Sequence, residues 1–153
     1  MAFLYSLAVA VAKAMTPVVA KSAKTKAFVA GRKALWTQLK GIPQNKKVVW
    51  MHCASLGEYE QGLPVLTALK NNHPEYFYLV TFFSPSGYEV RKNHGIADLA
   101  TYLPWDTKAD VKRFIALVNP VMALLVKYEF WPNLIRELQR NDVPLYLIAG
   151  LCR

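Results

Sequence analysis

The chain has 153 residues, of which 54% are hydrophobic and 19% charged, a composition that excludes disordered and fibrous proteins and suits about one globular domain. The formal net charge is +9, and the excess is confined to residues 1–47, which hold nine Lys/Arg and no Asp/Glu, while residues 48–153 hold ten of each. Cys53 and Cys152 form no CxxC pair, so neither a zinc site nor a disulfide framework is indicated.

Residues 2–20 form a strongly apolar segment that is interrupted by Lys13 and Pro17. A full membrane span is therefore marginal, and a signal peptide is not indicated because nothing basic precedes Lys13. Apolar residues recur at helical spacing, namely Phe3, Leu7, Val11, Met15 and Val18. This pattern predicts a helix that lies in or dips into a membrane interface, with the buried first helix of a soluble domain as the open alternative.

The basic residues of this segment suit an anionic surface. We place a membrane before nucleic acid because they follow an apolar run, and we predict no nucleic-acid partner. The predicted headgroup contacts are Lys13, Lys21, Lys24, Arg32 and Lys33. Turn residues at 41–45 end the segment. We therefore predict an apolar and basic membrane-associating arm over residues 1–45 and a Rossmann-like domain over residues 46–153.

From Lys46 onward, strand and helix patterns alternate. The predicted strands are Val48–Cys53, Phe77–Phe83, Leu99–Leu103, Val121–Val126 and Pro144–Ala149. The predicted helices are Glu60–Asn71, residues 84–93, a helix capped by Thr107, and Trp131–Asn141. This alternation predicts an α/β fold with a doubly wound parallel sheet. Because the chain ends soon after its fifth strand, we expect it to be one half of a larger protein.

Three polar segments follow three of these strands. They contain Ser55, Gly57 and Glu58; Ser84, Ser86 and Gly87; and Glu129 beside Trp131. The carboxyl ends of parallel strands are where ligands bind in open α/β sheets. Glu58 is a candidate general base, and a carboxylate beside a tryptophan suits a carbohydrate. Each segment also fits a helix cap, and the absence of Gly-rich phosphate motifs argues against a nucleotide site.

Taken together, these segments resemble the N-terminal half of 3-deoxy-D-manno-octulosonic acid (Kdo) transferases of lipopolysaccharide biosynthesis. The resemblance rests on the apolar first helix and six sequence marks in order: Gly31-Arg32-Lys33, Trp50–Glu58, Thr81, Ser84–Gly87, Tyr102–Asp106 and Glu129–Asn133. The chain departs from the family's pattern at Lys127, where an acidic residue is common, and at residues 149–153.

The resemblance implies a GT-B glycosyltransferase at the cytoplasmic face of the bacterial inner membrane. Its N-terminal domain takes a lipid A precursor, and a C-terminal donor domain, absent from this chain, binds CMP-Kdo. No metal or other cofactor is implied. Transfer inverts the anomeric centre with Glu58 as general base, and the implied acceptor contacts are Ser55, Gly57, Ser84, Ser86, Gly87 and Glu129.

Without its own donor domain, the chain alone is expected to be inactive. The alternative is a non-catalytic α/β module that binds anionic lipid or a protein partner through its basic arm.

Overall fold

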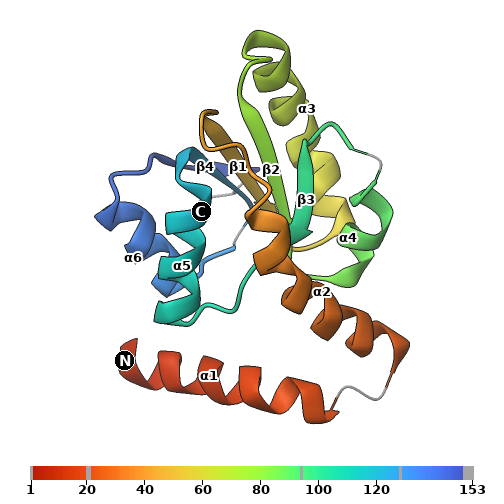
Figure 1. Cartoon of the computed structure of the whole chain (residues 1–153), viewed down its shortest axis with the longest axis vertical. Coiled ribbons are helices and arrows are strands. Elements are labelled where there is room, and N and C mark those ends of the chain that lie inside the picture. Colours follow the sequence, from red (N-terminus) through yellow and green to blue (C-terminus); the bar gives the residue numbers. More distant parts are fainter. Residues whose placement is uncertain (1, 20–21, 94, 128, 150–153) are drawn as a thin grey trace.

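Five parallel strands form a single sheet in the order β3-β2-β1-β4-β5 (Figure 1). The computed structural model describes residues 2–19, 22–93, 95–127 and 129–149. The strands are β1 (Val48–Cys53), β2 (Phe77–Phe82), β3 (Leu99–Tyr102), β4 (Pro120–Val126) and β5 (Leu145–Ile148). The parallel α/β sheet predicted from the sequence is confirmed.

Helices cover both faces of the sheet. One face carries α3 (Leu56–Asn72) and α4 (Pro85–Arg91). The opposite face carries α2 (Ala23–Leu39), α5 (Lys108–Val118) and α6 (Pro132–Arg140). The central strand β1 is buried along its whole length, which explains why it is apolar at every position except His52 rather than alternating.

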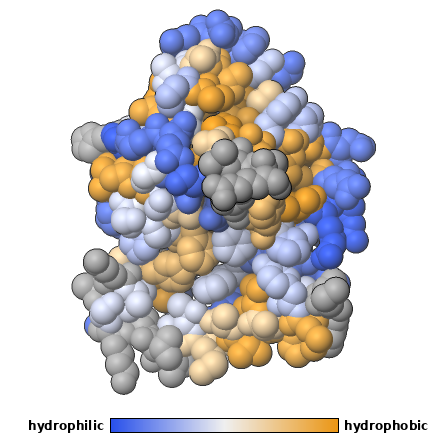
Figure 2. All heavy atoms as spheres, turned by 180° about the vertical axis from the view of Figure 1, so that it is seen from behind, coloured by the Kyte–Doolittle hydropathy of each residue, from blue (hydrophilic) through white to orange (hydrophobic). Residues whose placement is uncertain are grey.

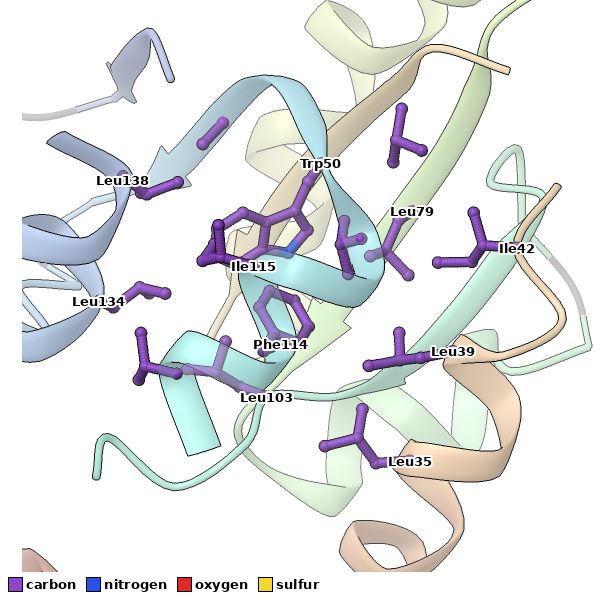
Figure 3. Close-up of a cluster of buried hydrophobic side chains, with 14 residues drawn as sticks. Leu35, Leu39, Ile42, Trp50, Leu79, Leu103, Phe114, Ile115, Leu134 and Leu138 are labelled. Atoms are coloured by element: carbon purple, nitrogen blue, oxygen red, sulfur yellow. The ribbon is translucent and has the colours of Figure 1, made fainter. Parts of the chain in front are cut away.

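Successive side chains of β1 enter two separate clusters, because residues of a strand alternate between its faces. Met51 and Cys53 pack under α3 and α4. Trp50 packs on the other side against Phe114 of α5, with ring centroids 5.0 Å apart in an edge-to-face arrangement (Figure 3). Both faces of the sheet are thus closed by hydrophobic packing.

Helix α2 contributes to this packing although it lies within the segment predicted as a basic arm. Leu35 and Leu39 are buried in the cluster around Trp50 (Figure 3). The helix approaches β3 closely at Gly31, where an added Cβ would lie 2.0 Å from Cε2 of Tyr102. At least from Gly31 onward, α2 therefore packs as part of the α/β unit. The division of the chain at residue 45 stays a prediction.

This close approach gives a stability prediction. Tyr102 is fully buried, and Tyr88 packs on its ring with centroids 4.4 Å apart, so the ring cannot move aside freely. Gly31→Ala is expected to lower the free energy of unfolding by about 1–3 kcal/mol, measured by urea denaturation. Gly57→Ala is the matched control, since a Cβ there meets nothing within 4 Å. Equal stability of the two variants would contradict this account of α2 packing.

Helix α1 (Ala2–Val19) lies across the edge of the sheet at which the strands end (Figure 1). Tyr5 donates a hydrogen bond of 2.9 Å to Asp106, and Lys13 forms a 2.5 Å ion pair with Asp110. These contacts attach α1 to the loop after β3 and to the first turn of α5. These contacts, between described residues, are polar.

The outer surface of α1 is apolar. Leu4, Leu7, Val11 and Met15 form an exposed stripe at helical spacing, and hydrophobic surface is visible along the lower edge of the molecule in Figure 2. Phe3 and Val18 were also predicted to belong to this stripe, but their side chains are not among those that the structure describes. Within the described ranges, no helix has the length and apolar content that a membrane crossing requires. The interfacial role of α1 stays a prediction.

Candidate active site

The strand order reverses between β1 and β4. From β1 the chain builds outward through β2 to β3, and it then returns to the other side of β1 to form β4. At such a reversal, the connections that leave the two strands run in opposite directions. Ligands of open α/β sheets usually bind at this point. Glu58 follows β1 and Glu129 follows β4, so both predicted carboxylates lie at this reversal.

Glu58 lies in the first turn of α3, not in a loop before the helix. The helix begins at Leu56, four residues earlier than predicted, with Ser55 as its extended N-cap. The prediction was wrong because Leu56 and Gly57 break the apolar periodicity that marks the helix interior. Oε2 of Glu58 accepts a hydrogen bond from the backbone N–H of Ala54. One oxygen thus orients the carboxylate, and the residue as a whole is only partly buried.

Glu129 is held by two donors on a shared oxygen. Oε2 lies 2.9 Å from Nε1 of Trp131 and 3.3 Å from Nε2 of His52. The hydrogen bond and charge of His52, with the Trp131 bond, lower the pKa of Glu129, although burial opposes them. This arrangement favours an ionised, fixed carboxylate.

His52 is itself held on its far side by β2. Its Nδ1 lies 2.9 Å from Oγ1 and 3.1 Å from the carbonyl oxygen of Thr81. Nδ1 therefore has a partner whether or not it carries a hydrogen. The Thr81 hydroxyl can donate to Nδ1 without a hydrogen, and the Thr81 carbonyl can accept from Nδ1–H. Trp50 donates to the same hydroxyl at 2.9 Å. A buried chain of hydrogen bonds thus runs from Trp50 through Thr81 and His52 to Glu129.

His52 is not among the residues predicted from the sequence. It is fully buried, and buried polar side chains are nearly always hydrogen-bonded. A histidine inside an otherwise apolar strand is the signal that could have identified it. Its partner Glu129, 77 positions away, could not have been assigned from spacing alone.

The lowered pKa of Glu129 gives a pH prediction. A depressed carboxyl pKa contributes stability that is present above the unfolded-state pKa, near 4.5, and lost as pH falls through the folded-state value. On acidification through this window, wild type should lose more unfolding free energy than Glu129→Gln. Urea denaturation at successive pH values measures this. Glu75→Gln is the control, because the side chain of Glu75 is 63% exposed, and its unfolding free energy should change with pH as that of wild type does. Parallel curves of unfolding free energy against pH for all three proteins would refute the prediction.

The turn after β2 lies against the turn after β1. The N–H of Ser84 donates to the carbonyl of Ala54 at 2.9 Å, and the hydroxyls of Ser84 and Ser86 lie 2.8 Å apart. The structure therefore brings both serines beside the Glu58 turn. Gly87 is different, because it is buried and a Cβ there would lie 2.3 Å from the ring of Phe82. Its role is to let α4 pack closely on β2, so its contact with an acceptor stays only a prediction.

Cys53 links the two carboxylates electrostatically. Burial raises the pKa of its thiol, and the negative charges of Glu58 and then Glu129 raise it further. Among the described residues, no three His, Cys, Asp or Glu side chains are grouped so as to hold a metal ion.

The predicted headgroup contacts divide into three groups. Arg32 is only 7% exposed and stacks on aromatic rings that the sequence does not place beside it, and its contact with headgroups stays a prediction. Lys13 is paired with Asp110, and Lys33 is exposed. Lys21 and the side chain of Lys24 lie outside the described residues.

Comparison with known proteins assigns most of the chain to one family. Residues 28–153 match the family model described as 3-deoxy-D-manno-octulosonic-acid transferase (kdotransferase). The 3-deoxy-D-manno-octulosonic acid transferase of Haemophilus influenzae is 33% identical over 103 residues, covering 67% of this chain and 24% of that protein. The Aquifex aeolicus enzyme of the same name is 41% identical over 91 residues, covering 59% of this chain and 25% of that protein. The chain spans about a quarter of the length of the curated relatives it matches.

Proposed function

This chain belongs to the 3-deoxy-D-manno-octulosonic-acid (Kdo) transferase family, and we propose that it is the acceptor-binding half of an inverting glycosyltransferase. In this proposal the enzyme transfers Kdo from CMP-Kdo to a lipid A precursor in lipopolysaccharide synthesis. The donor is bound by a second domain of the enzyme. No metal or further cofactor takes part.

The observation that carries this proposal is the pair of fixed carboxylates at the reversal between β1 and β4. In an inverting displacement, the acceptor hydroxyl attacks the anomeric carbon while CMP leaves from the opposite face. Glu58 accepts the hydroxyl proton through Oε1 as general base. Its other oxygen is held by the N–H of Ala54, so the base is already oriented when the acceptor arrives.

Glu129 has a different role in this proposal. Because His52 and Trp131 already donate to its Oε2, it stays ionised and accepts hydrogen bonds from hydroxyls of the acceptor sugar. The Trp131 ring stacks on Phe83 with centroids 5.1 Å apart, which gives an apolar surface beside the carboxylate. A charged acceptor of hydrogen bonds next to an aromatic surface suits the mixed polar and apolar faces of a sugar.

The exposed stripe of α1 supports association with the cytoplasmic face of the inner membrane. Leu4, Leu7, Val11 and Met15 are each at least half exposed, and they lie on the helix that crosses the edge of the sheet where the carboxylates are found. An interfacial helix there would bring the site to a lipid acceptor in the bilayer. Lys33 is exposed on the neighbouring α2 and can contribute to attraction by anionic lipid.

A transfer assay tests this proposal. The complete enzyme that carries this domain, supplied with CMP-Kdo and a lipid A precursor, is expected to yield a Kdo-bearing lipid and equimolar CMP. The chain of residues 1–153 alone should yield neither. Failure of the complete enzyme to transfer, together with retained binding of anionic vesicles, would instead favour a non-catalytic lipid-binding module.

A further inference from the structure

The hydrogens along the buried chain from Trp50 to Glu129 can be placed from its two ends. At the first end, the indole N–H of Trp50 can only donate, so Oγ1 of Thr81, 2.9 Å away, accepts there. That hydroxyl carries a single hydrogen of its own. Thr81 is fully buried, and among the described residues Nδ1 of His52, at 2.9 Å, is the acceptor available to this hydrogen. The Thr81 hydroxyl therefore donates to His52.

At the other end, the ionised carboxylate of Glu129 can only accept. Its Oε2 lies 3.3 Å from Nε2 of His52, and the indole N–H of Trp131 donates to the same oxygen at 2.9 Å. A bare Nε2 would set two acceptors against each other, whereas Nε2–H makes a charge-assisted hydrogen bond. A neutral histidine carries one ring hydrogen. Both ends of the chain of hydrogen bonds place that hydrogen on Nε2.

The contact with Glu129 does not depend on the charge of His52. The ring is fully buried, so its nitrogens depend on protein partners. When the ring is protonated, its second hydrogen lies on Nδ1, and the carbonyl oxygen of Thr81 at 3.1 Å can accept it. Of the other ionisable groups at this edge, Cys53 packs on the opposite face of the sheet and Glu58 is held in the first turn of α3. Nε2–H therefore faces Glu129 in both charge states.

We propose that His52 is a positioning residue for the reaction, with its hydrogen fixed on Nε2 by Thr81 and directed at Glu129. Two donors on one oxygen restrict the Glu129 carboxylate, so it is oriented before the acceptor sugar arrives. This inference rests on the proposed Kdo transfer for its kinetic consequence. The position of the hydrogen, however, can be measured without any transfer.

Nitrogen-15 NMR of the histidine-labelled chain tests the placement, because it distinguishes ring nitrogens that carry a hydrogen from bare ones. At about pH 8, where histidine is normally neutral, wild-type His52 is expected to have a bare Nδ1. Thr81→Val should place a hydrogen on Nδ1, since the carbonyl oxygen that remains beside it can only accept. Thr81→Ser should behave as wild type does. The chain has three histidines, and the signals lost in His52→Gln identify His52.

Thr101→Val is the matched control for this measurement. Thr101 is likewise buried in the sheet, but its hydroxyl donates to Gln38 rather than to a histidine, so the signals of His52 should not change. A hydrogen on Nδ1 of wild type at this pH would overturn the placement, and so would a bare Nδ1 in Thr81→Val. If Thr81→Val does not fold, the wild-type spectrum still decides the position of the hydrogen.

Steady-state kinetics of the complete enzyme test the positioning role. The amide nitrogen of a glutamine can take the place of Nε2 and still donate to Glu129, whereas that of an asparagine takes the place of Nδ1 and cannot. His52→Asn is therefore expected to raise KM for the acceptor at least about tenfold, as for loss of a hydrogen bond to a charged group, with little change in kcat. His52→Gln should stay close to wild type.

The two parts of the inference fail separately. Equal KM values for His52→Gln and His52→Asn would remove His52 from the positioning role, although transfer itself would be confirmed. Absence of transfer by the wild-type complete enzyme would instead overturn the proposed function, and with it the kinetic role of His52, while the hydrogen on Nε2 would stand on the NMR result.

Discussion

Glu58→Gln in the complete enzyme is expected to lower kcat by about 10²–10⁴-fold, the usual cost of removing a general base. The substituted amide keeps an oxygen that can accept the N–H of Ala54, the bond that orients the wild-type carboxylate. The first turn of α3 should therefore persist, and KM for the acceptor should change much less than kcat. Steady-state transfer assays with varied acceptor measure both constants.

Glu60→Gln is the matched control for this experiment. Glu60 lies two positions further along the same helix, and its carboxylate pairs with Arg91 at the surface. Loss of such a surface pair costs at most about 1 kcal/mol in stability, so kcat should stay near the wild-type value. Turnover of Glu58→Gln within about tenfold of wild type would remove Glu58 from the role of base, and it would leave the carboxylate as a helix cap.

The sheet could be predicted from the sequence because each strand carries its own local signal. Val48–Cys53 and Phe77–Phe82 are continuous runs of apolar, aromatic and β-branched residues bounded by turns, and their observed bounds agree with the predicted ones to within one residue. The carboxyl ends of parallel strands share one edge of a sheet. The convergence of Ser84 and Glu58 on that edge therefore followed from strand assignment alone.

Features that depend on distant partners could not be predicted in this way. In the sequence, Arg32 resembles a solvated basic residue. Its burial, however, depends on Phe83 and Trp105, which lie in the segments after β2 and β3. His52 likewise acquires its role only through Thr81 and Glu129. In both cases the deciding interactions join residues far apart in the chain, and hydrophobic periodicity carries no information about them.

Asp106 is another residue whose role depends on partners far away in the chain. It stabilises the start of the helix that follows Glu129. Helix α6 begins at Pro132, and its N-cap residue Trp131 makes no side-chain capping bond. Asp106, only 2% exposed, replaces that cap from the segment after β3. Its carboxylate accepts the N–H of Asn133 at 3.1 Å and that of Leu134 at 2.9 Å. A carboxylate at a helix N-terminus also interacts favourably with the helix dipole.

Asp106→Ala is therefore expected to lower the free energy of unfolding by about 3 kcal/mol, since each backbone N–H left without an acceptor costs about 1–3 kcal/mol. Asp106→Asn retains one acceptor oxygen and should lose about half as much. Tyr5→Phe removes only the 2.9 Å bond from α1 to the same carboxylate, so a loss near 1 kcal/mol is expected. Urea denaturation of the four proteins measures the series. A loss below about 1 kcal/mol for Asp106→Ala would mean that water or another group caps α6, and Glu129 would then be held by His52 and Trp131 alone.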